Sequence, residues 1–161
     1  MRVSPCGLYA RTIAEAVENA RLTAKITHNH PEGIKGAEAV SSLIFLAKEG
    51  KNKEYLRYYA NTFYIINFTL NDIRPNYTFK ESCQDSVPQA IECFLESENF
   101  EDCIRNAISI GGDSDTIAAI AGSIAEAYYG VDEDLKEKAR SYLDKGLIYL
   151  LDLAEKNLKE N

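Results

Sequence analysis

The sequence predicts an all-α protein. Apolar residues recur at spacings of three and four along most of its 161 residues, which is the periodicity of helices that bury one face. No segment shows the apolar–polar alternation of a half-buried strand, and no internal repeat is present. A chain of this length, 45% hydrophobic and 27% charged, is expected to fold as a single domain over residues 1–161 around one core.

Eight helices can be placed in order along the chain. Their predicted ranges are 12–27, 34–48, 53–65, 88–97, 100–109, 115–129, 135–143 and 147–158. Residues 1–9 are expected to be irregular, because Pro5 and Gly7 interrupt any periodic pattern there. Thr12 and Glu15 have the spacing of a capping box, which indicates the start of the first helix.

The middle of the chain combines a periodic helix with a long polar segment. The helix over 53–65 has a predicted buried stripe, which consists of Tyr55, Leu56, Tyr59, Phe63 and Ile66. Residues 67–87 are rich in Asn, Asp, Ser and Thr and read as a loop, and a loop of this length is usually functional or mobile. The next helix is expected to have Ser86 as its N-cap and Pro88 in its first turn.

Charge and cysteine content exclude several kinds of function. The net charge of -7 argues against a nucleic-acid backbone held by a basic patch. No apolar run approaches the length of a membrane span, and the first residues lack the apolar centre of a signal peptide. The four cysteines show no C-x-x-C spacing, which is typical of a cytoplasmic protein with free thiols, although a disulfide remains open.

The strongest candidate site is the sequence Gly-Gly-Asp-Ser-Asp-Thr at residues 111–116. Asp113, Asp115 and Thr116 offer hard oxygen ligands, which suit Mg²⁺, Mn²⁺ or Ca²⁺. An EF-hand is excluded, because its loop needs glycine at the position of Ala118. The alternative is purely structural: one aspartate caps the following helix and the other is solvated.

The only two histidines, His28 and His30, form a second candidate site in a turn bounded by Pro31 and Gly33. Zinc is disfavoured, because the cysteines have no ligand spacing. A histidine in such a turn can instead donate to a phosphate or hydroxyl of a ligand. The alternative is that each histidine bonds to nearby backbone.

Two stretches together resemble the ADP-ribosylglycohydrolase family. They are Thr-His-Asn-His-Pro-Glu-Gly-Ile-Lys-Gly-Ala at residues 27–37 and Ala-Ile-Ser-Ile-Gly-Gly-Asp-Ser-Asp-Thr-Ile-Ala at residues 107–118. The likeness continues over residues 122–130, and Met-Arg-Val-Ser-Pro at residues 1–5 resembles an internal segment of the family. The resemblance therefore covers most of residues 1–130, and residues 131–161 are expected to add C-terminal helices.

The resemblance implies an all-α multi-helix orthogonal bundle with a two-magnesium site at the base of a cleft. It also implies hydrolysis of the bond between ribose C1″ of ADP-ribose and a protein side chain or another acceptor. By the same resemblance, Asp113, Asp115 and Thr116 would bind Mg²⁺, and His28 would contact the diphosphate or ribose of the ligand. Arginine, serine and other acceptors all stay open.

Some motifs of the family are not found in this sequence. These are a Gly-Asp-x-x-Gly opening and a Thr-Asp-Asp motif that supplies the other metal ligands. We therefore expect an incomplete form of the fold with at most a partial magnesium site, from a truncated or split gene product that is weak or inactive unless a separate N-terminal fragment completes it. The alternative is a non-catalytic helical binding or structural module derived from the same family.

Overall fold

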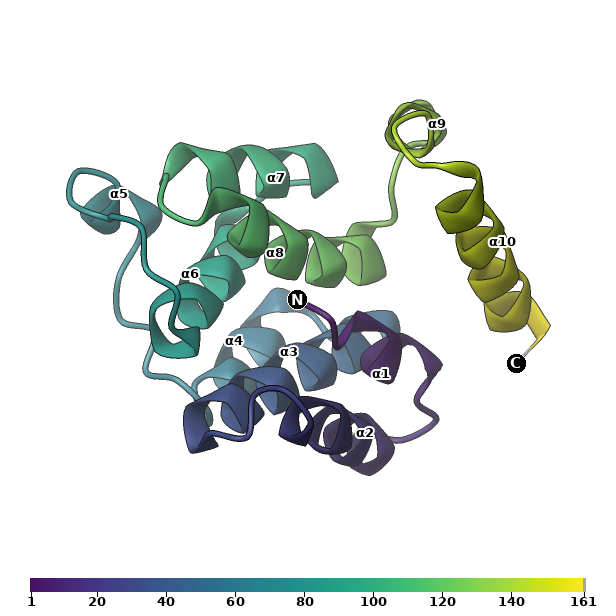
Figure 1. The fold of residues 1–161 in the computed structure, drawn as a ribbon. Helices are drawn as coiled ribbons and strands as arrows, with labels where there is room; N and C mark the ends of the chain where they lie inside the picture. The colour runs from purple at the N-terminus through teal and green to yellow at the C-terminus, as the bar shows by residue number, and fades with distance from the viewer. Residues whose placement is uncertain (161) are drawn as a thin grey trace. The chain divides into compact units, whose positions relative to one another are not determined.

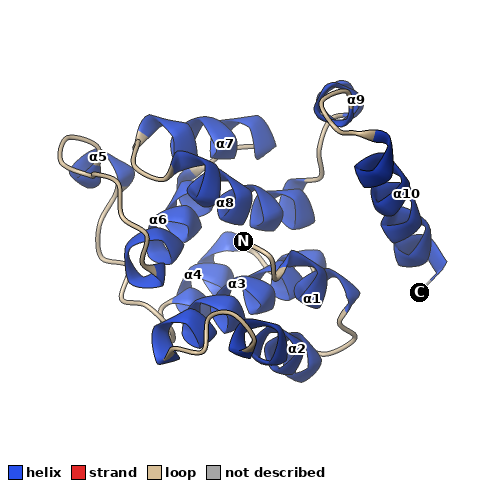
Figure 2. Ribbon diagram, viewed as in Figure 1, coloured by secondary structure: helices blue, strands red, loops and turns tan. Residues whose placement is uncertain are grey.

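The computed structural model describes the backbone of residues 1–160 and the side chains of residues 1–158. Ten helices and no strand are found in this part of the chain, which confirms the all-α class (Figures 1 and 2). The helices are α1 (Ser4–Tyr9), α2 (Ile13–Lys25), α3 (Pro31–Lys48), α4 (Lys53–Ala60), α5 (Leu70–Ile73), α6 (Cys83–Glu96), α7 (Phe100–Ser109), α8 (Ser114–Tyr129), α9 (Glu133–Arg140) and α10 (Lys145–Glu160). They fall into two compact units, Met1–Tyr129 and Gly130–Asn161.

Helix α3 is the centre of the first unit. It packs against α1, α2, α4, α6 and α8, as the ribbon shows (Figure 1). Residues 39–47 are all buried, because neighbours surround the helix rather than covering one face. Its buried hydroxyls are satisfied locally: Ser41 donates to the carbonyl of Ala16 at 3.0 Å and Ser42 to that of Glu38 at 2.6 Å. This core fixes the elements that form the site.

Helix α8 follows the acidic motif and packs against α1, α3, α6 and α7. Its many small residues allow this close packing. A Cβ atom at Gly122 would lie 2.9 Å from Cδ1 of Ile104 on α7. The small residue at 122 therefore lets α8 lie close to α7, which holds the helix after the acidic motif in place.

The expectation that residues 1–9 are irregular was wrong, because they contain α1. Pro5 lies in the first turn, where its missing N–H costs no helical hydrogen bond. Gly7 is a packing residue: a Cβ there would lie 2.4 Å from the carbonyl oxygen of Ser41 and 2.8 Å from Cβ of Ile44. Two residues that resemble helix breakers in sequence therefore begin one helix and let it approach another.

The predicted loop over 67–87 is shorter than expected. It contains α5, which begins with a capping box between Thr69 and Asp72. Helix α6 begins at Cys83 with Ser82 as its N-cap, so Ser86 is not the N-cap and Pro88 lies beyond the first turn. The hydroxyl of Ser86 instead donates to the carbonyl of Ser82 at 2.9 Å.

Other helix ends also moved. Helix α3 begins at Pro31 rather than residue 34, because the ring of His30 accepts the backbone N–H of Glu32 and caps the helix. Helix α4 ends at Ala60 rather than residue 65, and Asn61 Oδ1 accepts the N–H of Ile66 in the turn that follows. The predicted stripe on α4 is wrong at one place, since Tyr55 is exposed.

The second unit, Gly130–Asn161, consists of α9 and α10 in its described part. Arg140 at the end of α9 pairs with Asp152 and Glu155 on α10. The predicted ranges were 135–143 and 147–158, and each helix begins two residues before its predicted start. Among the described residues of the whole chain, no helix combines the length and apolar content that crossing a bilayer requires.

Candidate ligand pocket

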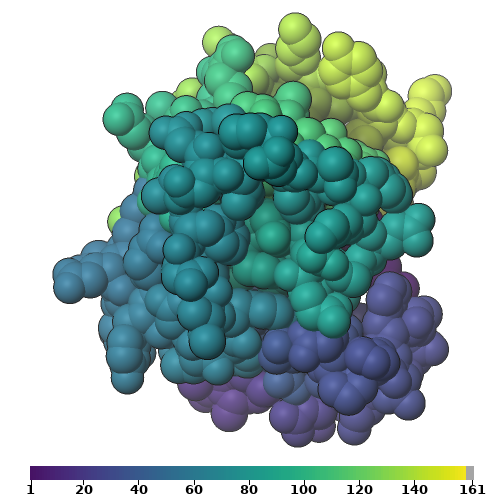
Figure 3. Space-filling model, turned by 90° about the vertical axis from the view of Figure 1, so that its left-hand side faces the viewer, coloured from purple at the N-terminus to yellow at the C-terminus, as the bar shows by residue number. Residues whose placement is uncertain are grey.

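A pocket of about 340 Å³ lies in the first unit. Six segments form its wall: the N-terminal residues, the C-terminal end of α2, the α2–α3 turn, one face of α3, the start of α6 and the N-terminal end of α8. On the face shown in Figure 3, blue residues of the α2–α3 turn lie directly below teal residues that lead into α6. The fold therefore brings together segments that are far apart in the sequence.

The acidic motif forms the N-terminal end of α8. The carbonyl of Asp113 accepts the N–H of Ile117 at 3.0 Å, which places Asp113 at the position that caps the helix. A side-chain hydrogen bond with Asp113 holds the pKa of Asp115 below its usual range, and the backbone N–H groups of Thr116 and of Asp115 itself lower that pKa further. Two carboxyl groups thus lie side by side at the positive end of a helix dipole, an arrangement that suits a hard cation.

Three of the four predicted site residues line the pocket, namely His28, Asp113 and Thr116. Asp115 is exposed beside Asp113 and is not part of the wall. Nowhere in the part of the chain with described side chains do three His, Cys, Asp or Glu residues gather closely enough to hold a metal ion. The two carboxylates and one hydroxyl are oxygen ligands of the type that Mg²⁺ prefers. Octahedral coordination would need further oxygen ligands beyond these three.

The two histidines have different surroundings. His28 lines the pocket, and its Nδ1 atom lies 2.8 Å from Thr27 Oγ1. His30 caps α3, because its Nδ1 atom accepts the backbone N–H of Glu32 at 3.3 Å. For His30, the alternative that the histidine bonds to nearby backbone is therefore correct. Gly33 keeps the turn tight, because a Cβ there would lie 2.7 Å from the carbonyl oxygen of His28.

Tyr77 connects the acidic motif to the start of α6. A Cβ at Gly112 would lie 2.5 Å from Cε1 of the Tyr77 ring, so only glycine fits beneath it. The Tyr77 hydroxyl donates to the carbonyl of Asp85 at 2.5 Å. Burial raises the pKa of Tyr77, and the nearby charges of Asp85 and Asp113 raise it further. The tyrosine therefore stays protonated and acts as a neutral spacer between two walls.

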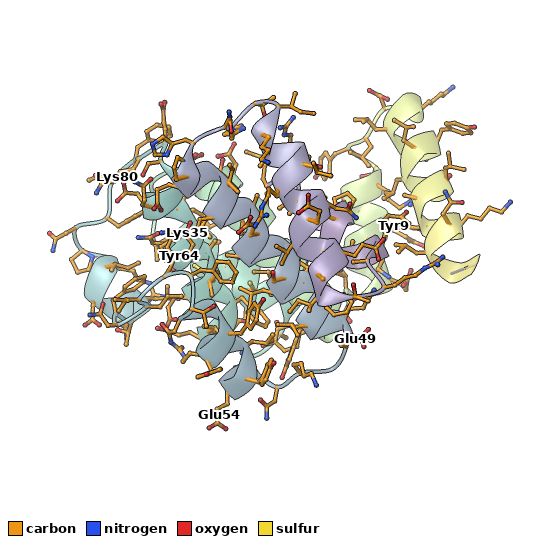
Figure 4. The ribbon with its side chains drawn as sticks, turned by 90° about the horizontal axis from the view of Figure 1, so that it is seen from below. Tyr9, Lys35, Glu49, Glu54, Tyr64 and Lys80 are labelled. Atoms are coloured by element: carbon orange, nitrogen blue, oxygen red, sulfur yellow. The ribbon has the colours of Figure 1, made fainter. Side chains whose placement is uncertain are left out.

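A third wall depends on Gly36 of α3. A Cβ there would lie 3.2 Å from Val87 Cγ2 and 3.3 Å from the hydroxyl of Tyr64, both tighter than ordinary contact. Lys35 covers the other side of Tyr64, with Nζ 4.5 Å from the ring centre, and the view from below shows the two side chains next to each other (Figure 4). The small residue on α3 keeps the pocket open at this point.

The sequence assigned several pocket residues to no site, which include Arg2, Glu81, Cys83 and Ser86. Signals for them did exist. Residues 1–5 resemble an internal segment of the family named in the sequence analysis, although they were expected to be irregular. The segment over 67–87 was expected to be functional or mobile, and it supplies three of the four.

Comparison with known proteins gives a consistent result. A sequence model of the ADP-ribosylglycohydrolase family matches residues 1–161. An uncharacterized protein of Archaeoglobus fulgidus is 30% identical over 79% of this chain and 47% of its own length. ADP-ribosylhydrolase ARH3 of Homo sapiens is 29% identical over 83% of this chain and 50% of its own, and ADP-ribosyl-[dinitrogen reductase] glycohydrolase of Rhodospirillum rubrum is 27% identical over 68% and 37%. The chain thus spans half the length of these relatives or less.

Proposed function

The chain belongs to the ADP-ribosylglycohydrolase family, and from this premise we propose that its pocket binds ADP-ribose with Mg²⁺ as part of a hydrolase that removes ADP-ribose from a modified protein side chain or a related acceptor. The observation that carries the proposal is the shared pocket of His28, Asp113 and Thr116. A donor for anionic oxygen and a set of hard oxygen ligands face one cavity, which is the chemistry that a diphosphate sugar and its cation require.

Each residue has a role in this proposal. Asp113, Asp115 and Thr116 would hold Mg²⁺ at the start of α8. Bound Mg²⁺ would orient the ribose hydroxyls and stabilise charge while water attacks C1″. His28 donates a hydrogen bond to a phosphate or hydroxyl oxygen and thereby orients the ligand. The packing of α8 against α1, α3, α6 and α7 keeps the start of this helix, and with it the carboxylates, in place.

Calorimetry of the full chain with Mg²⁺ and with ADP-ribose tests the proposal. We expect Asp113→Ala and Asp115→Ala each to weaken Mg²⁺ binding about tenfold or more, since each removes one of few charged ligands. Asp132→Asn is the matched control, because Asp132 occupies the N-cap of α9 with no side-chain capping bond and lies outside the pocket. A parent protein that binds neither Mg²⁺ nor ADP-ribose would overturn the proposal.

A second candidate is a binding module without catalysis. It is favoured by the absence, in the described part of the chain, of a complete group of metal-binding side chains. The two candidates differ in one measurement, the release of ADP-ribose from arginine-linked and serine-linked ADP-ribosylated proteins, followed by chromatography. Binding without release supports the module, and release that depends on Asp113 supports the hydrolase.

A further inference from the structure

Three exposed side chains, two of which line the pocket, form a hydrogen-bonded chain. The guanidinium of Arg2 donates through Nη2 to Thr27 Oγ1. Thr27 Oγ1 lies 2.8 Å from Nδ1 of His28. Arg2 and His28 line the pocket, and Thr27, in the turn between α2 and α3, connects them. The N-terminal segment and the α2–α3 turn are therefore linked by hydrogen bonds that end at the imidazole ring of His28.

The protons in this chain can be assigned from its chemistry. A guanidinium is always charged and only donates, so the Thr27 oxygen must accept from Arg2. The threonine hydroxyl has one proton of its own, and the nitrogen at 2.8 Å is a partner for it. The positive charge of Arg2 polarises the hydroxyl, which makes it a better donor toward the facing nitrogen. With the hydroxyl proton directed at the ring, Nδ1 of His28 is the acceptor of this bond.

We propose that Arg2 and Thr27 are positioning residues that hold neutral His28 in the tautomer with its proton on Nε2. A neutral imidazole carries one N–H, so an accepting Nδ1 leaves Nε2–H as the donor. The role of this donor rests on the proposed function: the diphosphate oxygens of ADP-ribose only accept hydrogen bonds, so the opposite tautomer would leave a lone pair in reach of them. The relay selects the ring state that can bind the ligand.

His30 provides an internal control within the same turn. Its Nδ1 atom accepts the backbone N–H of Glu32 at 3.3 Å. This bond also favours the Nε2–H tautomer, but it depends on backbone rather than on Arg2 or Thr27. A change in either relay residue should therefore alter one ring and leave the other as it was.

Long-range proton–nitrogen NMR of the full chain tests the relay directly, because the two tautomers give different patterns of ring nitrogen signals. The chain has two histidines, and His30→Asn, which retains a capping side chain, assigns them. At about pH 8.5, where an unperturbed imidazole is neutral, both rings should show the Nε2–H form. Thr27→Val should convert His28 to a mixture of tautomers without changing His30. Thr27→Ser should retain the parent pattern, and Arg2→Met should give a partial mixture.

Affinity for ADP-ribose supplies the second readout. Thr27→Val should weaken binding about fivefold, the loss of roughly one hydrogen bond, whereas Thr27→Ser should stay within about twofold of the parent. A His28 ring with its proton on Nδ1 in the parent overturns the relay, as does a Thr27→Val variant whose His28 keeps a single tautomer. A parent with the expected tautomer that binds no ADP-ribose supports the relay and overturns only the proposed function. Circular dichroism of each variant confirms that the helices are retained.

Discussion

Gly111 and Gly112 share a backbone conformation but not their surroundings. Their φ angles are +73° and +69°, in the left-handed region that residues with a Cβ adopt only at a cost. Gly111 has no atom near the place of a Cβ, whereas Gly112 lies beneath the ring of Tyr77. A substitution at Gly111 would therefore cause backbone strain alone, whereas a substitution at Gly112 would cause backbone strain and a steric clash.

We expect Gly111→Ala to lower the free energy of unfolding by about 1 kcal/mol, the cost of a left-handed alanine. Gly112→Ala should cost about 2–4 kcal/mol, because the added methyl also displaces the Tyr77 ring. Urea unfolding followed by circular dichroism measures both. Equal losses in the two variants would show that the ring yields without cost.

At the residue scale, the sequence predicted what local spacing encodes. Asp113, Asp115 and Thr116 lie within four residues of the sequence, so their proximity needs no tertiary information. Arg2 and Cys83 reach the pocket only because α1 and α6 pack around α3, and no spacing in the sequence records that. Their place in the pocket could not be derived from composition or periodicity.

At the scale of elements, a buried ion pair joins α4 to α6. The two terminal nitrogens of the Arg57 guanidinium each lie 2.9 Å from one carboxylate oxygen of Glu92. The Glu92 side chain is 2% exposed and that of Arg57 is 40% exposed. Burial raises the pKa of Glu92 above its ordinary value of 4.5, and the bonds to Arg57 offset part of this rise.

Arg57→Ala should therefore destabilise the protein by about 2 kcal/mol at pH 7, less than the 3–5 kcal/mol of a fully buried pair, because Arg57 is partly exposed. Glu92 has a raised folded pKa, so its contribution favours the fold below about pH 4.5 and is lost as the pH rises through the folded pKa. The loss of unfolding free energy caused by Arg57→Ala should therefore be smaller at pH 5 than at pH 7, because a protonated Glu92 does not need the charge of Arg57.

The matched control for this variant is Arg105→Ala, in an exposed pair with Glu101 on α7. It should change the free energy of unfolding by about 0.5 kcal/mol or less at either pH. Urea unfolding at the two pH values measures both variants. If the Arg57 variant lost the same amount at pH 5 and pH 7, the Glu92 carboxyl would not be the source of the effect.

Helices differed in how well the sequence predicted them. The range of α7, Phe100–Ser109, agrees with the prediction at both ends, because an N-cap asparagine and a strong period define it. The sequence did not predict α1 and predicted too late a start for α6, and in both cases a proline was the reason. Pro5 and Pro88 look like boundaries in sequence, but one sits in a first turn and the other inside a helix that packing holds together.

At the scale of the whole molecule, all four cysteines are free, as the sequence predicted. Cys6 and Cys83 are half-buried, whereas Cys93 and Cys103 are fully buried. Burial raises the pKa of Cys93 and raises that of Cys103 to about 12, so neither forms the reactive thiolate in the folded state.

Ellman's reagent should therefore modify two thiols of the native protein within minutes and the other two only after unfolding. Cys83→Ser should leave one fast thiol, since Cys6 is the other. Absorbance of the released thiolate gives the count in each phase. Four thiols that react at one rate would show that the first unit opens readily.

The fold class was predictable because helical periodicity survives in any short window of the sequence. The arrangement was not, because it depends on contacts between distant residues. A change near residue 130 was visible in the sequence, where the family resemblance ended and two further helices were expected. In the structure the chain forms two compact units, Met1–Tyr129 and Gly130–Asn161.

The position of Tyr77 has an evolutionary consequence. Its ring occupies the space that any side chain at residue 112 would need, and its hydroxyl holds the carbonyl of Asp85 near the start of α6. A smaller residue at 77 would free this space, but the left-handed backbone at 112 would still favour glycine. In an alignment of related chains, position 112 should therefore stay glycine even where position 77 varies, and a chain that has lost the tyrosine should carry a compensating change near residue 85.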